Sequence, residues 1–500
     1  MTKTYPLGLL LFSVSAAPLF SQAVPISSVP GLAVPTTACT GKTSLLCAIP
    51  NLYGPGGLVL PNPSVGTSFA SAFATQFAAT ATQITLLPLA NPESGFVYQY
   101  DPRTGLYSRS SQSLGPVLTE RGETIGRHKF AFGGTYQRFR FQKLDGVDLH
   151  NVPVLYPTVK TSVPVGDPYL ATQFISTQNS VDIKLNQFTA FATFGITNRI
   201  DVSVAVPFMQ VGFNVNSLAT INRTLIPGAN GLGTEPILAQ NPTGGSPLVG
   251  CCSNGGPGPY GPVFANFFDP KNPAGSVQRE FSNNHSTQQG DLYWDPSNNS
   301  AQGIGDVIVR AKANVYHNEN VSFALLTDIR VPTGDASNFL GTGSLGIRPV
   351  AAMSFREAWF TPHINLGYQW NGSSVLGGNP YLGTKSSLPG WAIFSAGSDI
   401  PVSKYVTFAA DYLGQELINA PRIGMETIQS PAPLATTGQV GSFQTITPLG
   451  KQVYNQSDAS IGMKVSAFDH LLLTVNAIIA LNNGGVRQRV TPMAGLSYVF

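Results

Sequence analysis

The sequence is poor in charged residues. Only 11% of its 500 residues are Asp, Glu, Lys or Arg, whereas about 25% is usual in a soluble domain. The formal net charge is +3, and neither a Lys/Arg run nor a basic patch with interleaved aromatic residues occurs, so a nucleic-acid partner is not expected. Gly and Pro number 52 and 39 without a Gly-X-Y repeat, which indicates many turns and long loops. Something other than charge must stabilise the surface.

Catalytic motifs are lacking as well. The chain has six His, and it contains neither a Gly-X-Ser-X-Gly nor a His-Glu-X-X-His motif. His285 and Ser286 are adjacent in an Asn-rich stretch with no carboxylate placed beside them. We therefore expect no enzyme activity, no cofactor and no metal site, and hydrolysis of membrane lipid is the least favoured function.

Cysteine is limited to four residues, Cys39, Cys47, Cys251 and Cys252. Their spacings match no structural zinc site, and no His lies near them. In an oxidising compartment four cysteines allow three disulfide connectivities. A bond between Cys39 and Cys47 suits the spacing, but the sequence does not choose among the three.

Long hydrophobic runs are absent after the N-terminal residues. The longest strongly apolar segment, residues 471–481, contains Thr and Asn and is shorter than the roughly 20 residues of a transmembrane helix. The sequence therefore excludes membrane crossing by helices. At the N-terminus, Lys3 precedes the apolar stretch LGLLLFSV, and Ser21-Gln22-Ala23 offers the small residues at which signal peptidase cleaves. We predict a cleaved signal peptide over residues 1–23, and export.

Alternation of apolar and polar residues takes the place of hydrophobic runs. In FTPHINLGYQW, residues 360–370, apolar residues occupy the even positions, and His363 and Asn365 lie on the opposite face. This length suits a tilted strand that crosses the hydrocarbon layer. The segments DVIVRAKANV and SFALLTDIRV alternate in the same way. Because a period of two fits a half-buried strand in any antiparallel protein, alternation alone does not establish a membrane protein.

The connections between the strands discriminate better. The predicted strands are 128–141, 181–196, 199–213, 304–315, 321–331, 344–355, 359–370, 391–400, 404–414, 457–467, 471–481 and 486–500. Their connections alternate between long and short, as in outer-membrane barrels with tight periplasmic turns. We therefore predict an all-β fold, a transmembrane antiparallel β-barrel of about 12 strands (range 10–14), over residues 121–500 in the outer membrane. In the first strand, Gly133-Gly134 predicts a β-bulge, which leaves the faces of Arg138 and Arg140 undetermined.

The final strand ends on AGLSYVF. Leu496, Tyr498 and Phe500 are spaced two apart and fall on the lipid face, whereas Arg487 and Arg489 fall on the lumen face. A terminal aromatic residue facing lipid resembles the signal by which outer-membrane barrels are recognised for insertion. We therefore predict that these three residues form that signal, with outer-membrane lipid and the barrel-assembly machinery as partners.

Several motifs between residues 303 and 370 resemble those of a known family. A Gly-X-Gly-Asp strand start (303–306) is followed by a Pro-Thr-Gly-Asp strand end (332–335), a Gly-rich loop and an Asn-X-Gly-Tyr strand (365–368). Together with FATFGITNRIDVSVAVPF (191–208) and ADYLGQEL (410–417), they resemble the outer-membrane transporter family named for the MetA pathway of phenol degradation. The resemblance covers most of residues 180–500. It implies a channel or transporter for hydrophobic or aromatic compounds.

Charged residues on the inward face are predicted to line the lumen. If the turns are centred near Asn318 and Asn338, Asp306 lies opposite Arg330 and Asp328 lies opposite Arg348. These pairs form either a ladder of ion pairs in the wall or a charged constriction that orients solute. The lumen-lining candidates are Asp306, Arg310, Lys312, Asp328, Arg330, Arg348, His363, Asn365, Asp411, Lys464, Arg487 and Arg489.

Residues 24–120 precede the predicted barrel. Phe69, Phe73 and Phe77 have the spacing of a short helix, and GFVYQYDPRTGLYSR (95–109) predicts a small hairpin that turns at DPRTG. The region is predicted either to plug the pore or to form a periplasmic extension.

The predicted strand number limits the pore. Twelve strands lie between the about 8 whose interior side chains can fill and the 16–18 that leave an aqueous channel, so a narrow or plugged pore is expected. The predicted function is passive uptake of small solutes, hydrophobic or aromatic in class. The alternative is a structural or adhesive barrel with a closed pore, whose long loops at 217–302 and 415–456 bind a partner. The solute and the oligomeric state are not determined by the sequence.

Overall fold

The structure is a computed structural model. It describes residues 38–39, 41–52, 98–101, 106–109, 113–157, 173–223, 278–283, 293–294, 298–357, 359–380, 382–434, 437–468 and 470–500. The predicted signal peptide, the Phe69–Phe77 helix, the Cys251–Cys252 pair and His285 lie outside these residues. No helix in the described ranges has the length and apolarity to cross a membrane.

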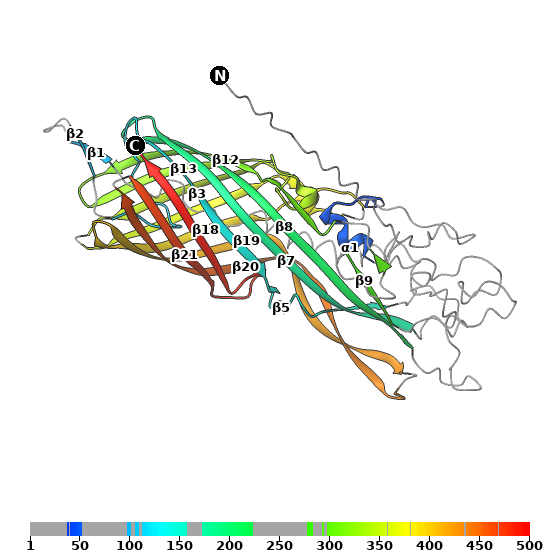
Figure 1. Cartoon of the computed structure of the whole chain (residues 1–500). Coiled ribbons are helices and arrows are strands. Elements are labelled where there is room, and N and C mark those ends of the chain that lie inside the picture. Colours follow the sequence, from blue (N-terminus) through cyan, green and yellow to red (C-terminus); the bar gives the residue numbers. More distant parts are fainter. Residues whose placement is uncertain are drawn as a thin grey trace, which may run out of the picture.

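Twelve strands of the described chain close into an antiparallel barrel (Figure 1). In the order of their pairing they are β3 (Phe130–Phe141), β7 (Gln173–Gly195), β8 (Ile200–Arg223), β12 (Val307–His317), β13 (Val321–Val331), β14 (Gly346–Phe355), β15 (Thr361–Asn371), β18 (Gly390–Ser403), β19 (Val406–Pro433), β20 (Val440–Phe468), β21 (Leu471–Ala480) and β23 (Val490–Val499). Strand β23 pairs with β3 from Met493 with Gln137 to Val499 with Ala131. This pairing leaves no edge in lipid and confirms the predicted fold.

The two ends of the barrel differ. Short turns at 196–199, 318–320, 356–360, 404–405 and 469–470 lie at the end that holds Phe130 and Phe500, and such turns mark the periplasmic end. The hairpin of β1 (Tyr98–Asp101) and β2 (Leu106–Arg109), predicted from the sequence, lies at this end in Figure 1. The other, extracellular end carries the longer connections. Its smaller elements are η2 (Leu45–Cys47), α1 (Ala48–Asn51), β4 (Lys143–Leu144), β5 (Val147–Asp148), β6 (Val152–Pro157), β9 (Gln278–Ser282), β10 (Tyr293–Trp294), β11 (Ser300–Ile304), η3 (Ala336–Asn338), β16 (Ser373–Ser374), η4 (Val375–Gly377), β17 (Ser386–Ser387) and β22 (Val486–Arg487).

The N-terminal residues 41–52 lie at the extracellular end. A disulfide joins Cys39 to Cys47, and the backbone N–H of Leu45 donates to Oδ1 of Asn338 at 3.1 Å. Part of the region that was predicted to be a plug or a periplasmic extension therefore packs on the opposite mouth.

The outer surface is an apolar band bordered by aromatic side chains. Leu366 and Ile364, on the lipid face predicted for β15, are 60% and 46% exposed. Exposed aromatic residues border the band near the periplasmic end (Phe132, Phe194, Trp359, Phe360, Tyr405, Phe408 and Phe500) and near the extracellular end (Tyr136, Phe188, Phe208, Trp370 and Tyr412). Aromatic girdles of this kind lie at the two membrane interfaces of outer-membrane barrels. Leu496 and Phe500 are exposed and Tyr498 is half-buried; their role in insertion stays a prediction.

The polarity of β7 and β8 inverts at the extracellular girdle. Below it, Phe188 to Phe194 on β7 and Val202 to Phe208 on β8 point apolar side chains outward at even positions. Above it, apolar side chains move to the odd, inward positions, where Ile183, Leu185 and Phe213 are buried. The strands therefore continue well beyond the membrane, and their predicted ends at 181 and 213 are too short because the sequence pattern changes phase there.

Strand β3 follows the same inversion. Its register with β7 and β23 runs through Gly133 and Gly134 without a shift, so the predicted β-bulge is wrong. The glycines instead admit two aromatic rings, because a Cβ would lie 2.8 Å from Phe191 at Gly133 and 2.7 Å from Phe188 at Gly134. Arg138 therefore keeps the alternation and faces outward, as does Arg140.

The predicted loop at 415–456 is wrong. Strands β19 and β20 continue through it as a long hairpin that projects from the extracellular end, drawn in orange in Figure 1. The register shifts between Leu417 and Ala420, between Arg422 and Ile423, and between Gln429 and Pro433. These irregularities break the period of two, which is why the sequence suggests a loop.

The lipid face gives a first testable prediction. Leu366→Arg is expected to lower the free energy of unfolding by ~2–4 kcal/mol, because it places a cation on the outward face at the depth of the hydrocarbon. Urea titration of the barrel reconstituted in lipid measures it. The control is Leu449→Arg on the projecting hairpin, where the leucine is 49% exposed, and a change within about 0.5 kcal/mol is expected. Equal losses at both positions would contradict the lipid-facing assignment.

Candidate functional site

A buried cluster of charges lies on the inner face of β12, β13 and β14. Asp328 is opposite Arg310 on one side and Arg348 on the other. The Nε of Arg310 lies 2.6 Å from Oδ1 of Asp328, and the Nε of Arg348 lies 2.9 Å from Oδ2. The predicted Asp328–Arg348 register is therefore found. The predicted opposition of Asp306 and Arg330 is wrong, because Arg330 is paired with Ile308.

Asp306 instead fastens the Gly-rich loop that follows β13. Its carboxylate accepts from the backbone N–H of Gly334 at 3.1 Å and from that of Thr342 at 2.7 Å. Arg330 still approaches it diagonally, with Nε at 3.5 Å from Oδ2. A Cβ at Gly341 would lie 2.3 Å from Oδ1 of Asp306, so this position requires glycine. The Gly-Asp motifs therefore hold a loop closed over the barrel rim.

Residues 113–126, called here the lumen segment, cross the periplasmic half of the lumen before the chain enters β3. Eight backbone and side-chain groups illustrate its attachment. Leu114 N donates to Thr407 Oγ1 (2.9 Å), Thr119 Oγ1 to Asp411 Oδ1 (2.9 Å), Glu120 N to Asn365 Oδ1 (2.8 Å), Gly122 N to Ser354 Oγ (2.8 Å), Thr124 Oγ1 to Asn198 O (2.8 Å), Ile125 N to Asp201 Oδ2 (2.8 Å), Asn314 Nδ2 to Gly122 O (2.7 Å) and Lys464 Nζ to Leu114 O (3.4 Å). The segment is almost entirely buried, and the predicted domain boundary at 120/121 falls inside it.

The lumen segment also contributes charges of its own. Glu120 pairs with Arg310, which links it to the Asp328 cluster. Glu123 lies 3.2 Å from Nη2 of Arg356 at the periplasmic turn. The sequence offered only a weak signal for this role, three charged residues at 120, 121 and 123 in a chain with little charge. The predicted lumen residues Asn365, Asp411 and Lys464 thus contact protein here, not an open channel.

His363 lies in a buried polar chain. Its Nδ1 is 2.8 Å from Oγ of Ser354, and its Nε2 contacts Asp399, which also accepts from Ser113 of the lumen segment. The three side chains are of the types found in a hydrolytic triad. The Ser354 hydroxyl, however, also accepts from the backbone N–H of Gly122 and is 1% exposed, so the lumen segment covers it. The arrangement fastens the segment to three strands.

The remaining candidates are spread along the barrel. Lys312 is buried and lies beside Asp201 in the register of β12 with β8. Arg487 belongs to the extracellular end, where its Nη1 is 3.1 Å from Oδ2 of Asp458. Arg489 is exposed and precedes β23, outside the buried set. No group of three His, Cys, Asp or Glu side chains suited to a metal ion occurs in the described part of the chain.

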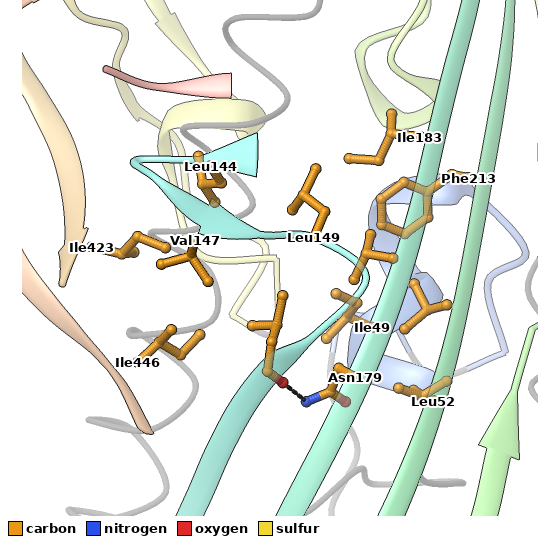
Figure 2. Close-up of a pocket in the computed structure, with 13 residues that line it drawn as sticks. Ile49, Leu52, Leu144, Val147, Leu149, Asn179, Ile183, Phe213, Ile423 and Ile446 are labelled. Atoms are coloured by element: carbon orange, nitrogen blue, oxygen red, sulfur yellow. Dashed lines mark hydrogen bonds between the residues drawn. The ribbon is translucent and has the colours of Figure 1, made fainter. Parts of the chain in front are cut away.

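An apolar pocket lies at the extracellular mouth (Figure 2). It encloses about 620 Å³ of empty space, some of it open to solvent. Its walls come from the disulfide-bonded N-terminal residues, the β4–β5 hairpin and the upper parts of β6, β7, β8, β19 and β20. The lining residues are Ile49, Leu52, Leu144, Val147, Leu149, Val152, Asn179, Val181, Ile183, Phe213, Val215, Ile423 and Ile446.

One polar side chain interrupts this wall. The Nδ2 of Asn179 donates to the carbonyl of Val152 at 3.0 Å and to Oγ1 of Thr177 at 2.9 Å. The pocket was not predicted from the sequence, because its residues come from segments that were taken as loops or as the N-terminal region. The inverted polarity of β7 and β8 is the signal that could have revealed it.

The family model described as "Putative MetA-pathway of phenol degradation" matches residues 273–382, which confirms the predicted resemblance over that range. Among solved structures, the COG4313 outer membrane channel from Pseudomonas putida F1 is similar, with a TM-score of 0.37, 11% identity and coverage of 76% of this chain and 98% of that one. The P. putida toluene transporter TodX gives 0.31, 10%, 76% and 92%. A Pseudomonas aeruginosa FadL homologue gives 0.29, 8%, 83% and 99%. No curated protein matches the chain.

Proposed function

We propose that this outer-membrane barrel takes up small apolar solutes passively, and that the extracellular pocket captures them first. The observation that carries the proposal is the lining of that pocket, which is apolar at every position except Asn179. Pockets for small molecules are typically about 300–1,000 Å³, mostly apolar, with few polar groups. Transfer of apolar surface from water into such a pocket provides the driving force for capture.

The position of the pocket also supports this function. It lies above the extracellular girdle, where Phe213 and Ile183 face inward. Further down the same strands, Leu185 and Met209 continue the apolar inner face. Below them the inner face becomes polar at Thr193 and is crossed by the lumen segment. Passage to the periplasm therefore requires this segment to move, and no energy-coupling element is needed for diffusion.

Filling the pocket is expected to weaken capture. Val147 belongs to the β4–β5 hairpin and lines the pocket, so Val147→Trp places a large ring in the space that a solute would occupy. We expect the dissociation constant for naphthalene, measured by calorimetry in detergent, to rise at least about tenfold. Uptake of naphthalene into proteoliposomes should fall in parallel.

The matched control is Val440→Trp on the projecting hairpin, where the valine is 54% exposed. It should leave both readouts unchanged. If Val147→Trp binds and transports naphthalene as the unmodified protein does, the pocket is not the capture site.

The second candidate is a structural or adhesive barrel with a permanently closed pore. The lumen segment favours it, because so many strands hold that segment in place. The projecting β19–β20 hairpin would then offer the binding surface. A barrel that binds naphthalene but never transports it, even at high solute concentration, would support this candidate.

A further inference from the structure

Exposed cations gather on the outer face of the barrel where β3 and β7 leave the membrane. Arg138 and Arg140 are on β3, and Lys184 is opposite Arg140 on β7. The side chains of Arg140 and Lys184 are 56% and 43% exposed. Asp182 is the acidic residue among them, 2.5 Å from Nζ of Lys184 and 3.7 Å from Nε of Arg140. Three cations against one carboxylate leave the cluster positive.

The depth of this cluster is fixed by the register. Tyr136, Phe188 and Phe208 form one row across β3, β7 and β8 at the extracellular girdle. Arg138 is one outward-facing position above Tyr136, and Arg140 is two above it. At about 3.3 Å per residue, the cluster begins roughly 7 Å above the girdle, which is the depth of lipid headgroups rather than of free solvent.

The surroundings also suit a lipid. Asn186 donates to Gln210 at 3.2 Å and accepts from the hydroxyl of Tyr136 at 3.0 Å, so a polar row separates the cations from the apolar band. Below this row, Phe188 and Phe208 offer an apolar surface at the level of acyl chains. Charged headgroups and acyl chains would thus each meet a complementary part of the wall.

From this geometry we propose that the outer face of β3 and β7 is a binding site for a phosphorylated glycolipid of the outer leaflet. Its phosphate groups accept from Arg138, Arg140 and Lys184, and its acyl chains lie along Phe188 and Phe208. Arg side chains are suited to phosphate because the planar guanidinium donates two parallel hydrogen bonds. The proposal is independent of solute transport, since this face points away from the pocket and the lumen.

The test measures binding of purified lipid A to the full-length barrel in a zwitterionic detergent. The unmodified protein is expected to bind lipid A at least about tenfold more tightly than the same lipid with its phosphates removed. The triple variant R138Q/R140Q/K184Q should lose at least about tenfold in affinity for lipid A. Asp182→Asn should bind lipid A more tightly, because it removes the competing carboxylate.

The matched control neutralises three exposed cations at the periplasmic end, in the variant R127Q/R199Q/K404Q. It should keep the affinity of the unmodified protein. Circular dichroism and heat-modified gel mobility establish that every variant is folded. Equal affinity for the two lipids, or an equal loss in the two triple variants, would overturn the proposal.

Discussion

Replacing the lumen segment, residues 113–126, with a Gly-Ser linker of equal length should raise the single-channel conductance of the barrel by roughly an order of magnitude. A closed sheet of twelve strands leaves space inside that only an additional element can fill, and here that element is the buried lumen segment. The linker cannot reproduce the contacts of Thr119 with Asp411 or of Glu120 with Asn365 and Arg310. Water and ions should therefore enter the periplasmic half. Planar-bilayer recordings measure the change.

The control replaces residues 427–440, at the tip of the β19–β20 hairpin, with a linker of the same length. That hairpin projects beyond the membrane (Figure 1), so the conductance should not change. If the barrel without its lumen segment is folded and conducts no better than the unmodified protein, this segment does not control passage.

The largest loss of stability is expected at the centre of the ion-pair cluster. Asp328→Ala should lower the free energy of unfolding by ~3–5 kcal/mol, because it leaves two guanidinium groups buried without their carboxylate. Arg310 and Asp328 have side chains only 7% and 4% exposed. Urea unfolding in lipid vesicles measures the loss.

Two controls accompany this variant. Asp148→Ala removes an aspartate that is 62% exposed and should cost no more than about 0.5 kcal/mol. Replacing Arg310, Asp328 and Arg348 together with Leu should recover most of the loss, because apolar residues of similar volume can substitute for a buried ion pair. If Asp328→Ala costs less than about 1 kcal/mol, water reaches the cluster.

The membrane-spanning part of the fold could be predicted because the lipid constrains it strongly. Hydrocarbon on one side and polar groups on the other impose a period of two, so the faces of Leu366 and Asn365 follow from the sequence. The pairing partners do not follow as directly. The register of β12 with β13 includes an irregularity between Asn314 and Tyr316, which places Arg310 rather than Arg330 beside Asp328 in the sheet.

The lumen segment could not be predicted, because it has no periodicity to detect. Residues such as Gly122 and Thr119 are buried through contacts with strands that are hundreds of residues away in the chain. The pocket escaped prediction for a related reason. Ile49, Val147 and Ile446 come from three separate regions, and only the closed barrel brings them together.

The polarity inversion of β3, β7 and β8 sets how deep the barrel sits. A shift of two residues along a strand moves the wall by about 7 Å. Sinking by that amount would draw Arg138 and Asn186 into hydrocarbon, and rising would lift Phe188 into water. Both directions are unfavourable, so the barrel has one preferred immersion and a bilayer of different thickness must adapt to it. The mouth of the pocket is thereby kept at a constant height above the cell surface.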